Sequence, residues 1–114
     1  MKSILESSKV FESNIRIQMI ASLCSGSLTY KELKEICNCT DGNMATHLKK
    51  LLAEEFVTEK KEFINKKPQT TYTLTNKGKE EFIAYIDLLK SLVQEEEDEN
   101  AKNFRQNSTF MLGV

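Results

Sequence analysis

The segment from Thr29 to Val57 most strongly constrains what this chain can fold into. Two short amphipathic stretches are joined there by a polar turn, and the second leads directly into residues typical of β-strands. Thr29 followed three residues later by Glu32 matches a capping box, which predicts that a helix begins at Tyr30. Two short helices around a tight turn, followed by a strand, indicate a helix-turn-helix motif with a β-hairpin after it.

Each of the two predicted helices has one apolar side. The first helix spans Tyr30 to Cys37, and its expected core residues are Leu33, Ile36 and Cys37. A turn centred on Asn38 and Cys39 follows, and Thr40 is then a suitable N-cap for a second helix from Asp41 to Glu54. The apolar stripe expected to face the core in this second helix consists of Met44, Ala45, Leu48, Leu51 and Leu52.

The opposite side of the second helix has a different chemistry. It carries amide, hydroxyl, imidazole and ammonium groups, which suit base edges and phosphates, on Asn43, Thr46, His47, Lys49 and Lys50, and Thr40 at its start is a further candidate DNA contact. Asn43 and Thr46 lie in the N-terminal half, which in a helix-turn-helix points into the major groove, whereas the two lysines suit phosphates. His47 has an alternative role as a hydrogen-bonding residue within the domain. An ordinary solvated helix surface is the alternative for the whole group.

Two strands are predicted after the second helix, from Phe56 to Ile64 and from Thr71 to Leu74. The residues between them, 65–70, read Asn-Lys-Lys-Pro-Gln-Thr and form a basic hairpin tip that contains a proline. Such a tip is typical of a wing that contacts DNA, although an ordinary soluble turn has a similar composition. The candidate DNA-contacting residues of this wing are Lys66, Lys67, Gln69 and Thr70.

Helices are also expected on both sides of this unit. A short one is predicted from Ser3 to Phe11, and Ser13 is a suitable N-cap for another from Asn14 to Ser25. Thr75 caps a long final helix from Asn76 to about Glu95, whose apolar residues cover more than one side. The surplus predicts burial against a second copy of the chain, and the candidate dimerisation residues are Phe82, Tyr85, Ile86, Leu89, Leu92 and Val93.

The charge of the chain is unevenly distributed. The net charge is −1, but residues 1–79 hold 13 basic and 9 acidic side chains, whereas residues 80–114 hold 3 basic and 8 acidic ones. The helix-turn-helix part is therefore mildly basic, and the acidity lies in a C-terminal appendage that includes the run 95–99. Because an excess of four positive charges is modest, any basic footprint for DNA must be local.

The same sequence argues against several other functions. No apolar run is long enough to span a membrane and no secretory signal is recognisable, so a cytoplasmic location is expected. No nucleophile elbow or phosphate-binding loop occurs, and the single histidine offers no metal-binding pair, so neither catalysis nor a cofactor is expected. Cys24, Cys37 and Cys39 are interpreted as reduced thiols rather than metal ligands; a thiol switch is the alternative, because Cys39 lies beside the second helix.

The chain resembles the small winged-helix transcriptional regulators allied to the MarR and ArsR families. The resemblance covers about residues 13–82 and depends on Arg16 in NIRIQMI together with three segments, LTYKELKE, TDGNMATHLKKL and KKPQTTYTLTNKGKE. It implies a dimeric bacterial or archaeal transcription factor whose recognition helix enters the major groove while the wing reaches a flanking minor groove. Metal-sensing ArsR relatives carry a Cys-x-Cys pair near the start of the helix that precedes the recognition helix. Here Cys37 lies at the end of that helix and Cys39 in the turn after it, so no metal site is expected.

Together these observations predict an α+β, mostly helical fold: a winged helix-turn-helix with a two-stranded wing and a long C-terminal dimerisation helix. The expected division is a DNA-binding domain at 1–79, a dimerisation helix at 80–99 and a tail at 100–114. The expected function is sequence-specific binding of double-stranded DNA by a homodimer that represses transcription from a near-palindromic operator. The alternatives are a winged-helix module that binds another protein, and a regulator gated by a thiol or by an effector of unknown identity at the dimer interface.

Overall fold

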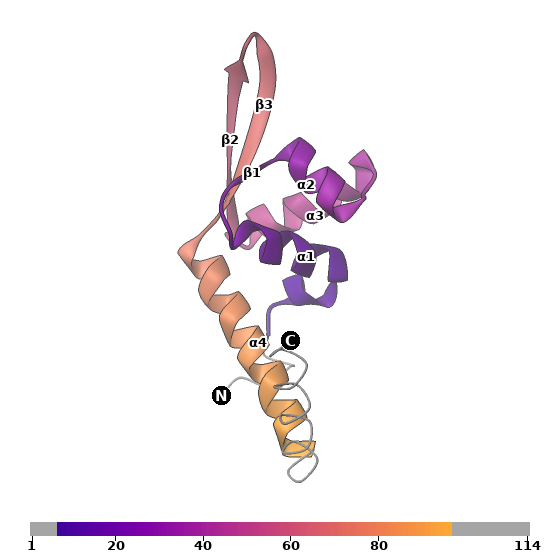
Figure 1. Ribbon diagram of the computed structural model, residues 1–114, viewed down its shortest axis with the longest axis vertical. Coiled ribbons are helices and arrows are strands. Elements are labelled where there is room, and N and C mark those ends of the chain that lie inside the picture. Colours follow the sequence, from indigo (N-terminus) through magenta and orange to yellow (C-terminus); the bar gives the residue numbers. More distant parts are fainter. Residues whose placement is uncertain (1–6, 97–114) are drawn as a thin grey trace, which may run out of the picture.

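The computed structural model describes residues 7–96, and Figure 1 shows how their helices and strands are arranged. Three short helices lie beside the base of a long β-hairpin, and a long fourth helix leads away from that base in the opposite direction. In chain order the elements are η2 (Lys9–Glu12), α1 (Asn14–Leu23), β1 (Leu28–Thr29), α2 (Tyr30–Cys37), α3 (Asp41–Ala53), β2 (Val57–Ile64), β3 (Lys67–Leu74) and α4 (Asn76–Glu96). The predicted winged helix-turn-helix class is confirmed.

Polar caps determine where the three short helices begin. The Ser13 hydroxyl accepts a hydrogen bond from the Arg16 backbone N–H (3.3 Å) at the start of α1. At the start of α2, Thr29 and Glu32 form the predicted capping box, with bonds of 2.9 and 3.1 Å in the two directions. The Thr40 hydroxyl caps α3 in the same manner. The turn between α2 and α3 passes through Asn38, whose left-handed backbone ends α2.

The core lies between these helices and the base of the hairpin. Phe56, 1% exposed, is the largest of its fully buried side chains. Two predictions for this core are wrong: Ile36 is 44% exposed and Ala45 is exposed. Ile36 precedes the buried Cys37 and Ala45 follows the buried Met44. Because neighbouring residues of an α-helix are rotated by about 100° around its axis, both side chains face solvent. The buried apolar residues of the three short helices are Met19, Ile20, Leu23, Leu33, Cys37, Met44, Leu48 and Leu51.

The hairpin belongs to a three-stranded antiparallel sheet in the order β1-β3-β2. The short strand β1 was not predicted, and it pairs with β3 only at Tyr72 and Thr71. The predicted six-residue tip is also wrong, because β3 begins at Lys67 and the turn consists of Asn65 and Lys66 alone. Both turn residues have positive φ, 53° and 65°, which is the geometry of a type I′ turn.

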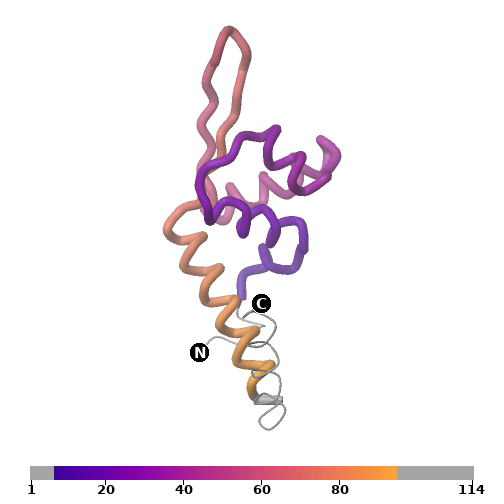
Figure 2. The backbone as a smooth tube through the Cα atoms, viewed as in Figure 1, coloured from indigo at the N-terminus to yellow at the C-terminus, as the bar shows by residue number. Residues whose placement is uncertain are grey.

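The long helix α4 is joined to the rest through the backbone of Phe56. The Phe56 N–H donates to the Leu51 carbonyl of α3 (2.9 Å), and the Phe56 carbonyl accepts from the Thr75 N–H (2.9 Å). Thr75 then caps α4 by accepting from the Gly78 N–H (3.0 Å). Ring stacking against Phe11 holds the next turns of α4, and the helix then extends beyond the helical unit (Figure 2).

The N-terminal helix predicted from Ser3 to Phe11 lies partly outside the described residues. Its described part is the single 3-10 turn η2, whose Val10 and Phe11 are buried. Phe11 stacks on Tyr85 at 4.4 Å between ring centroids and also contacts Phe56 (5.7 Å) and Phe82 (6.4 Å). This aromatic cluster connects the N-terminal turn to α4 and to the centre of the core.

Candidate nucleic-acid interface

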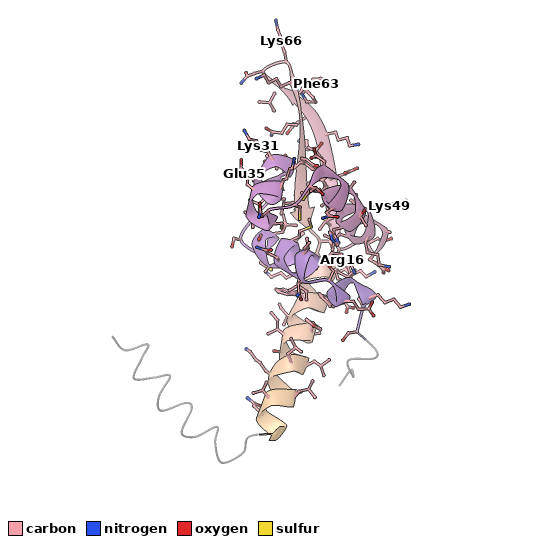
Figure 3. All side chains as sticks on the ribbon, turned by 90° about the vertical axis from the view of Figure 1, so that its right-hand side faces the viewer. Arg16, Lys31, Glu35, Lys49, Phe63 and Lys66 are labelled. Atoms are coloured by element: carbon pink, nitrogen blue, oxygen red, sulfur yellow. The ribbon has the colours of Figure 1, made fainter. Side chains whose placement is uncertain are left out.

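The exposed side of α3 presents the polar groups that the sequence predicts for a recognition helix. Asn43, Thr46 and Lys49 are exposed, and His47 and Lys50 are half-buried. They lie away from Met44, Leu48 and Leu51, which face the core, and Figure 3 shows Lys49 on the outer side of the helical unit. Lys50 forms an ion pair with Glu54 (3.4 Å) near the C-terminal end of α3. Its ammonium is therefore shared between that carboxylate and any ligand.

The first turn of α3 is attached to α2 through Asp41. The Tyr30 hydroxyl donates to the Asp41 carboxylate at 2.6 Å, and the Lys34 ammonium lies 2.9 Å from the same oxygen. The Tyr30 hydrogen bond, followed by that of Lys34, lowers the pKa of Asp41, while the bond to Asp41 raises the pKa of Tyr30. The carboxylate therefore stays ionised at neutral pH. This contact fixes the position of α3 against α2, and periodicity alone did not reveal it.

A second long-range contact holds the middle of α3 against α1. The guanidinium of Arg16 donates to the carbonyls of Val10 (2.9 Å) and Lys9 (3.0 Å), and its Nη1 lies 3.3 Å from Nδ1 of His47. Because arginine can only donate, Nδ1 of His47 must be the acceptor, and the ring proton is then on Nε2. Arg16 thus has a structural role, and His47 keeps one N–H donor.

The environment of His47 favours its neutral form. Burial, and then the positive charge of Arg16, lowers the pKa of His47 below its ordinary value. The unfolded chain therefore binds a proton more readily than the folded one, so the free energy of unfolding should fall as the pH drops from about 7.5 to 5.5, across the ordinary pKa of about 6.5. Since the chain has one histidine, this window isolates it well.

Urea unfolding of the wild type and of His47→Gln at the two pH values measures this effect. The wild type should lose more stability on acidification than the variant, because glutamine can accept the Arg16 hydrogen bond at both pH values. Equal losses in the two proteins would mean that protonation of His47 is not coupled to folding.

The wing carries the second predicted group of site residues. Lys66 lies in the turn at the far end of the hairpin, where Figure 3 shows it at the tip, and Lys67 is the exposed first residue of β3. Gln69 and Thr70, which were predicted to lie in the tip, are half-buried strand residues. Exposed Lys60 and Lys61 on β2 add basic groups that were not predicted, although each lies within 4.0 Å of a glutamate of the same strand.

The three cysteines have different environments. Cys37 is buried at the end of α2, where burial raises the pKa of its thiol, and Cys39 is half-buried in the turn with its Sγ 3.5 Å from the Cys37 carbonyl. Cys24 is exposed. Among residues 7–96, no three histidine, cysteine, aspartate or glutamate side chains are grouped so that they could hold a metal ion. A raised thiol pKa also disfavours the reactive thiolate at Cys37.

Comparison with known families identifies the class of protein that this fold and this helix define. Residues 15–93 match the model of the winged helix DNA-binding domain family. The chain belongs to this family, whose model describes a DNA-binding domain. Within the described part of the chain, no helix has the length and apolar character needed to cross a membrane.

Individual proteins resemble the chain in sequence or in fold. An uncharacterized protein from Methanocaldococcus jannaschii is 43% identical over 81 residues, which span 68% of this chain and 86% of the relative. A MarR-family protein from Porphyromonas gingivalis W83 superimposes with a TM-score of 0.61 at 22% identity, over 76% of this chain and 84% of that one. The transcriptional repressor BigR from Xylella fastidiosa superimposes with a TM-score of 0.57 at 21% identity, over 67% of this chain and 74% of that one. These two structural likenesses show the shared fold.

Proposed function

We propose that this protein binds specific sites on double-stranded DNA as a homodimer and represses transcription by occupying them. The observation that carries the proposal is the exposed polar side of α3, which is held in place from two directions. Tyr30 and Lys34 fix its first turn, and Arg16 fixes its middle. A side chain that reads a base must be held within a fraction of an ångström, and such contacts limit its freedom.

The remaining hydrogen-bonding capacity of each side chain suggests its role on α3. Asn43 has a free carboxamide, which can pair with both groups on the edge of adenine. Thr46 donates to the Gly42 carbonyl (3.0 Å), so its oxygen is left to accept from adenine or cytosine. His47 offers its Nε2 proton to a guanine acceptor or a phosphate. Thr40 accepts its capping bond and can still donate to a phosphate.

The lysines suit the DNA backbone, since an ammonium on a flexible chain attracts phosphate without reading the sequence. In this proposal Lys49 and Lys50 contact phosphates beside the major groove, and the wing places Lys66 and Lys67 on a flanking segment. Gln69 and Thr70 follow Lys67 in β3 and would lie next to the same segment of DNA. The division into a DNA-binding domain at 1–79, a dimerisation helix at 80–99 and a tail at 100–114 belongs to the same proposal. Residues 97–114 lie outside the part of the chain that the structure describes.

The apolar residues on α4 support dimerisation. Phe82 and Tyr85 pack against Phe11 within the protomer, whereas Ile83, Leu89, Leu92 and Val93 are exposed and Ile86 is half-buried. A second copy related by twofold symmetry would cover them. Two recognition helices would then enter successive major grooves about 34 Å apart, which requires a near-palindromic site.

Fluorescence anisotropy with duplex DNA from upstream of the protein's own gene tests the proposal. A preference of about a hundredfold or more over a scrambled duplex, together with a clear dependence on salt, is the expected result. Equal and weak binding of both duplexes, under reducing and oxidising conditions alike, would contradict it. That outcome would favour the winged-helix module that binds another protein, which the net charge of −1 would suit.

The same assay separates the two kinds of DNA contact. Replacing both Lys66 and Lys67 by alanine should weaken binding to every sequence and reduce the slope of log affinity against log salt by about 1.8, because two phosphate contacts are lost. Asn43→Ala should instead leave the slope unchanged and relax the preference at one base position, at a cost of about 1–3 kcal/mol on the preferred site. If the two variants behave alike, the assignment of roles is incorrect.

A further inference from the structure

An aromatic side chain stands uncovered near the tip of the wing. Phe63 is 77% exposed, the highest value among the large hydrophobic side chains of the described residues. It is the last but one residue of β2, and Figure 3 shows it just below Lys66. A phenylalanine exposed to this degree gives up nearly all the free energy that its burial would supply, so the fold itself does not account for its place there.

The register of the hairpin places a second apolar group beside Phe63. Phe63 is directly opposite Pro68. The pair next to a two-residue turn, Ile64 and Lys67, is the hydrogen-bonded one, so the Phe63–Pro68 pair is of the non-hydrogen-bonded type, in which side chains lie closest. Proline is tolerated here because its missing N–H would point to the open edge of β3, beyond the reach of β1.

The alternation of side chains along the strands determines which way this pair projects. Phe63 shares a sheet face with Val57, and Pro68 shares it with Tyr72, at even spacings along their strands. Val57 and Tyr72 are buried against the helices. Phe63 and Pro68 therefore lie on the same face of the hairpin, in the part that extends beyond the helices (Figure 1). A hollow of about 620 Å³ separates the strand segment 67–70 from the first residues of α2, so the tip is free of its own domain.

Positive charge surrounds the pair. The segment from Glu59 to Lys67 contains four lysines and two glutamates, a net charge of +2. Lys61 lies on the same sheet face as Phe63, two residues away, while Lys66 forms the turn. An apolar tip surrounded by lysines complements one surface in particular: a groove lined by phosphates whose floor consists of stacked bases.

We propose that Phe63, supported by Pro68, is a wedge that enters the minor groove beside each half-site and partly unstacks one base step. The inference rests on the proposed binding of double-stranded DNA. Apolar side chains inserted in this way kink the duplex, by about 20–90°. Because pyrimidine–purine steps unstack most readily, the wedge adds specificity at a flanking position that α3 does not reach.

Duplexes that carry 2-aminopurine at successive flanking positions of the site protected by the wild type test this proposal. The fluorescence of 2-aminopurine increases when the base is unstacked, and energy transfer between labelled duplex ends reports the bend. The wild type should increase the fluorescence at one flanking position and shorten the end-to-end distance. Phe63→Ser should abolish both signals, and Phe63→Leu should restore part of them, since leucine is also an effective wedge.

Ile64→Ser is the matched control, because Ile64 is the neighbouring exposed apolar residue and projects from the opposite sheet face. It should retain both signals. If the wild type binds its site without either signal, or if Phe63→Ser retains both, the wedge is refuted while DNA binding stands. If the wild type binds no duplex specifically, the proposed function and the wedge fail together.

Discussion

Replacing Gly78 by alanine should destabilise the folded chain by about 1–3 kcal/mol, the range found when a well-packed site is overfilled. Gly78 is buried in the first turn of α4. A Cβ there would overlap the backbone carbonyl oxygen of Phe56 and would lie 2.9 Å from a methyl group of Leu74. The Phe56 carbonyl cannot move aside freely, because it accepts the Thr75 N–H that begins α4. The strain must therefore displace α4 itself.

Gly42→Ala is the matched control for this substitution. Gly42 also lies in the first turn of a helix, but nothing lies within 4 Å of a Cβ built there. The control should be neutral or more stable by about 0.5–1 kcal/mol, because alanine loses less backbone entropy than glycine on entering a helix. Urea unfolding followed by circular dichroism, at one fixed protein concentration, measures both variants. Equal stabilities would show that α4 does not depend on its close approach to Phe56.

The sequence was sufficient to predict the helix-turn-helix, because local chemistry determines its boundaries. Thr29, Glu32 and Thr40 are caps whose partners lie three residues away, so the sequence contains the whole interaction. The polar side of α3 follows from helical periodicity for the same reason. Errors in burial were confined to single positions, such as Ile36 and Ala45, beside residues that are buried.

What the sequence did not reveal depends on contacts between distant residues. Arg16 and His47 are 31 residues apart, and Tyr30 and Asp41 are 11 apart, so no periodic pattern connects them. The tip of the wing was predicted to be too long because Pro68 is usually a turn residue. Its place inside β3 depends on where β1 stops, which is a property of the whole sheet.

The backbone hydrogen bonds of Phe56 connect the proposed recognition helix α3 to the proposed dimerisation helix α4. The end of α3 is bonded to Phe56 through the Leu51 carbonyl, and Phe56 is bonded to Thr75 at the start of α4. No flexible linker lies between the recognition helix and the proposed dimerisation helix. In a symmetric dimer built on α4, the separation of the two recognition helices is therefore fixed by the protein rather than by the DNA.

Replacing both Leu89 and Val93 by glutamate should separate the proposed dimer and lower affinity for the operator about a hundredfold or more. The two residues are 38% and 58% exposed in the protomer, and with Ile86 they follow a spacing of three and four residues along α4. Burying unpaired carboxylates between two subunits is strongly unfavourable. The protomer, which leaves both positions exposed, should keep its fold.

Ala84→Glu is the control, because Ala84 is exposed on the far side of the same helix and also receives a glutamate. Sedimentation velocity should give the mass of a dimer for the wild type and Ala84→Glu, and that of a monomer for the double variant, with the same helical circular dichroism per residue for all three. A double variant that remains a dimer would place the interface away from Leu89 and Val93. A monomeric variant with unchanged operator affinity would instead mean that one protomer binds DNA alone, because the avidity of two linked recognition helices would then contribute nothing.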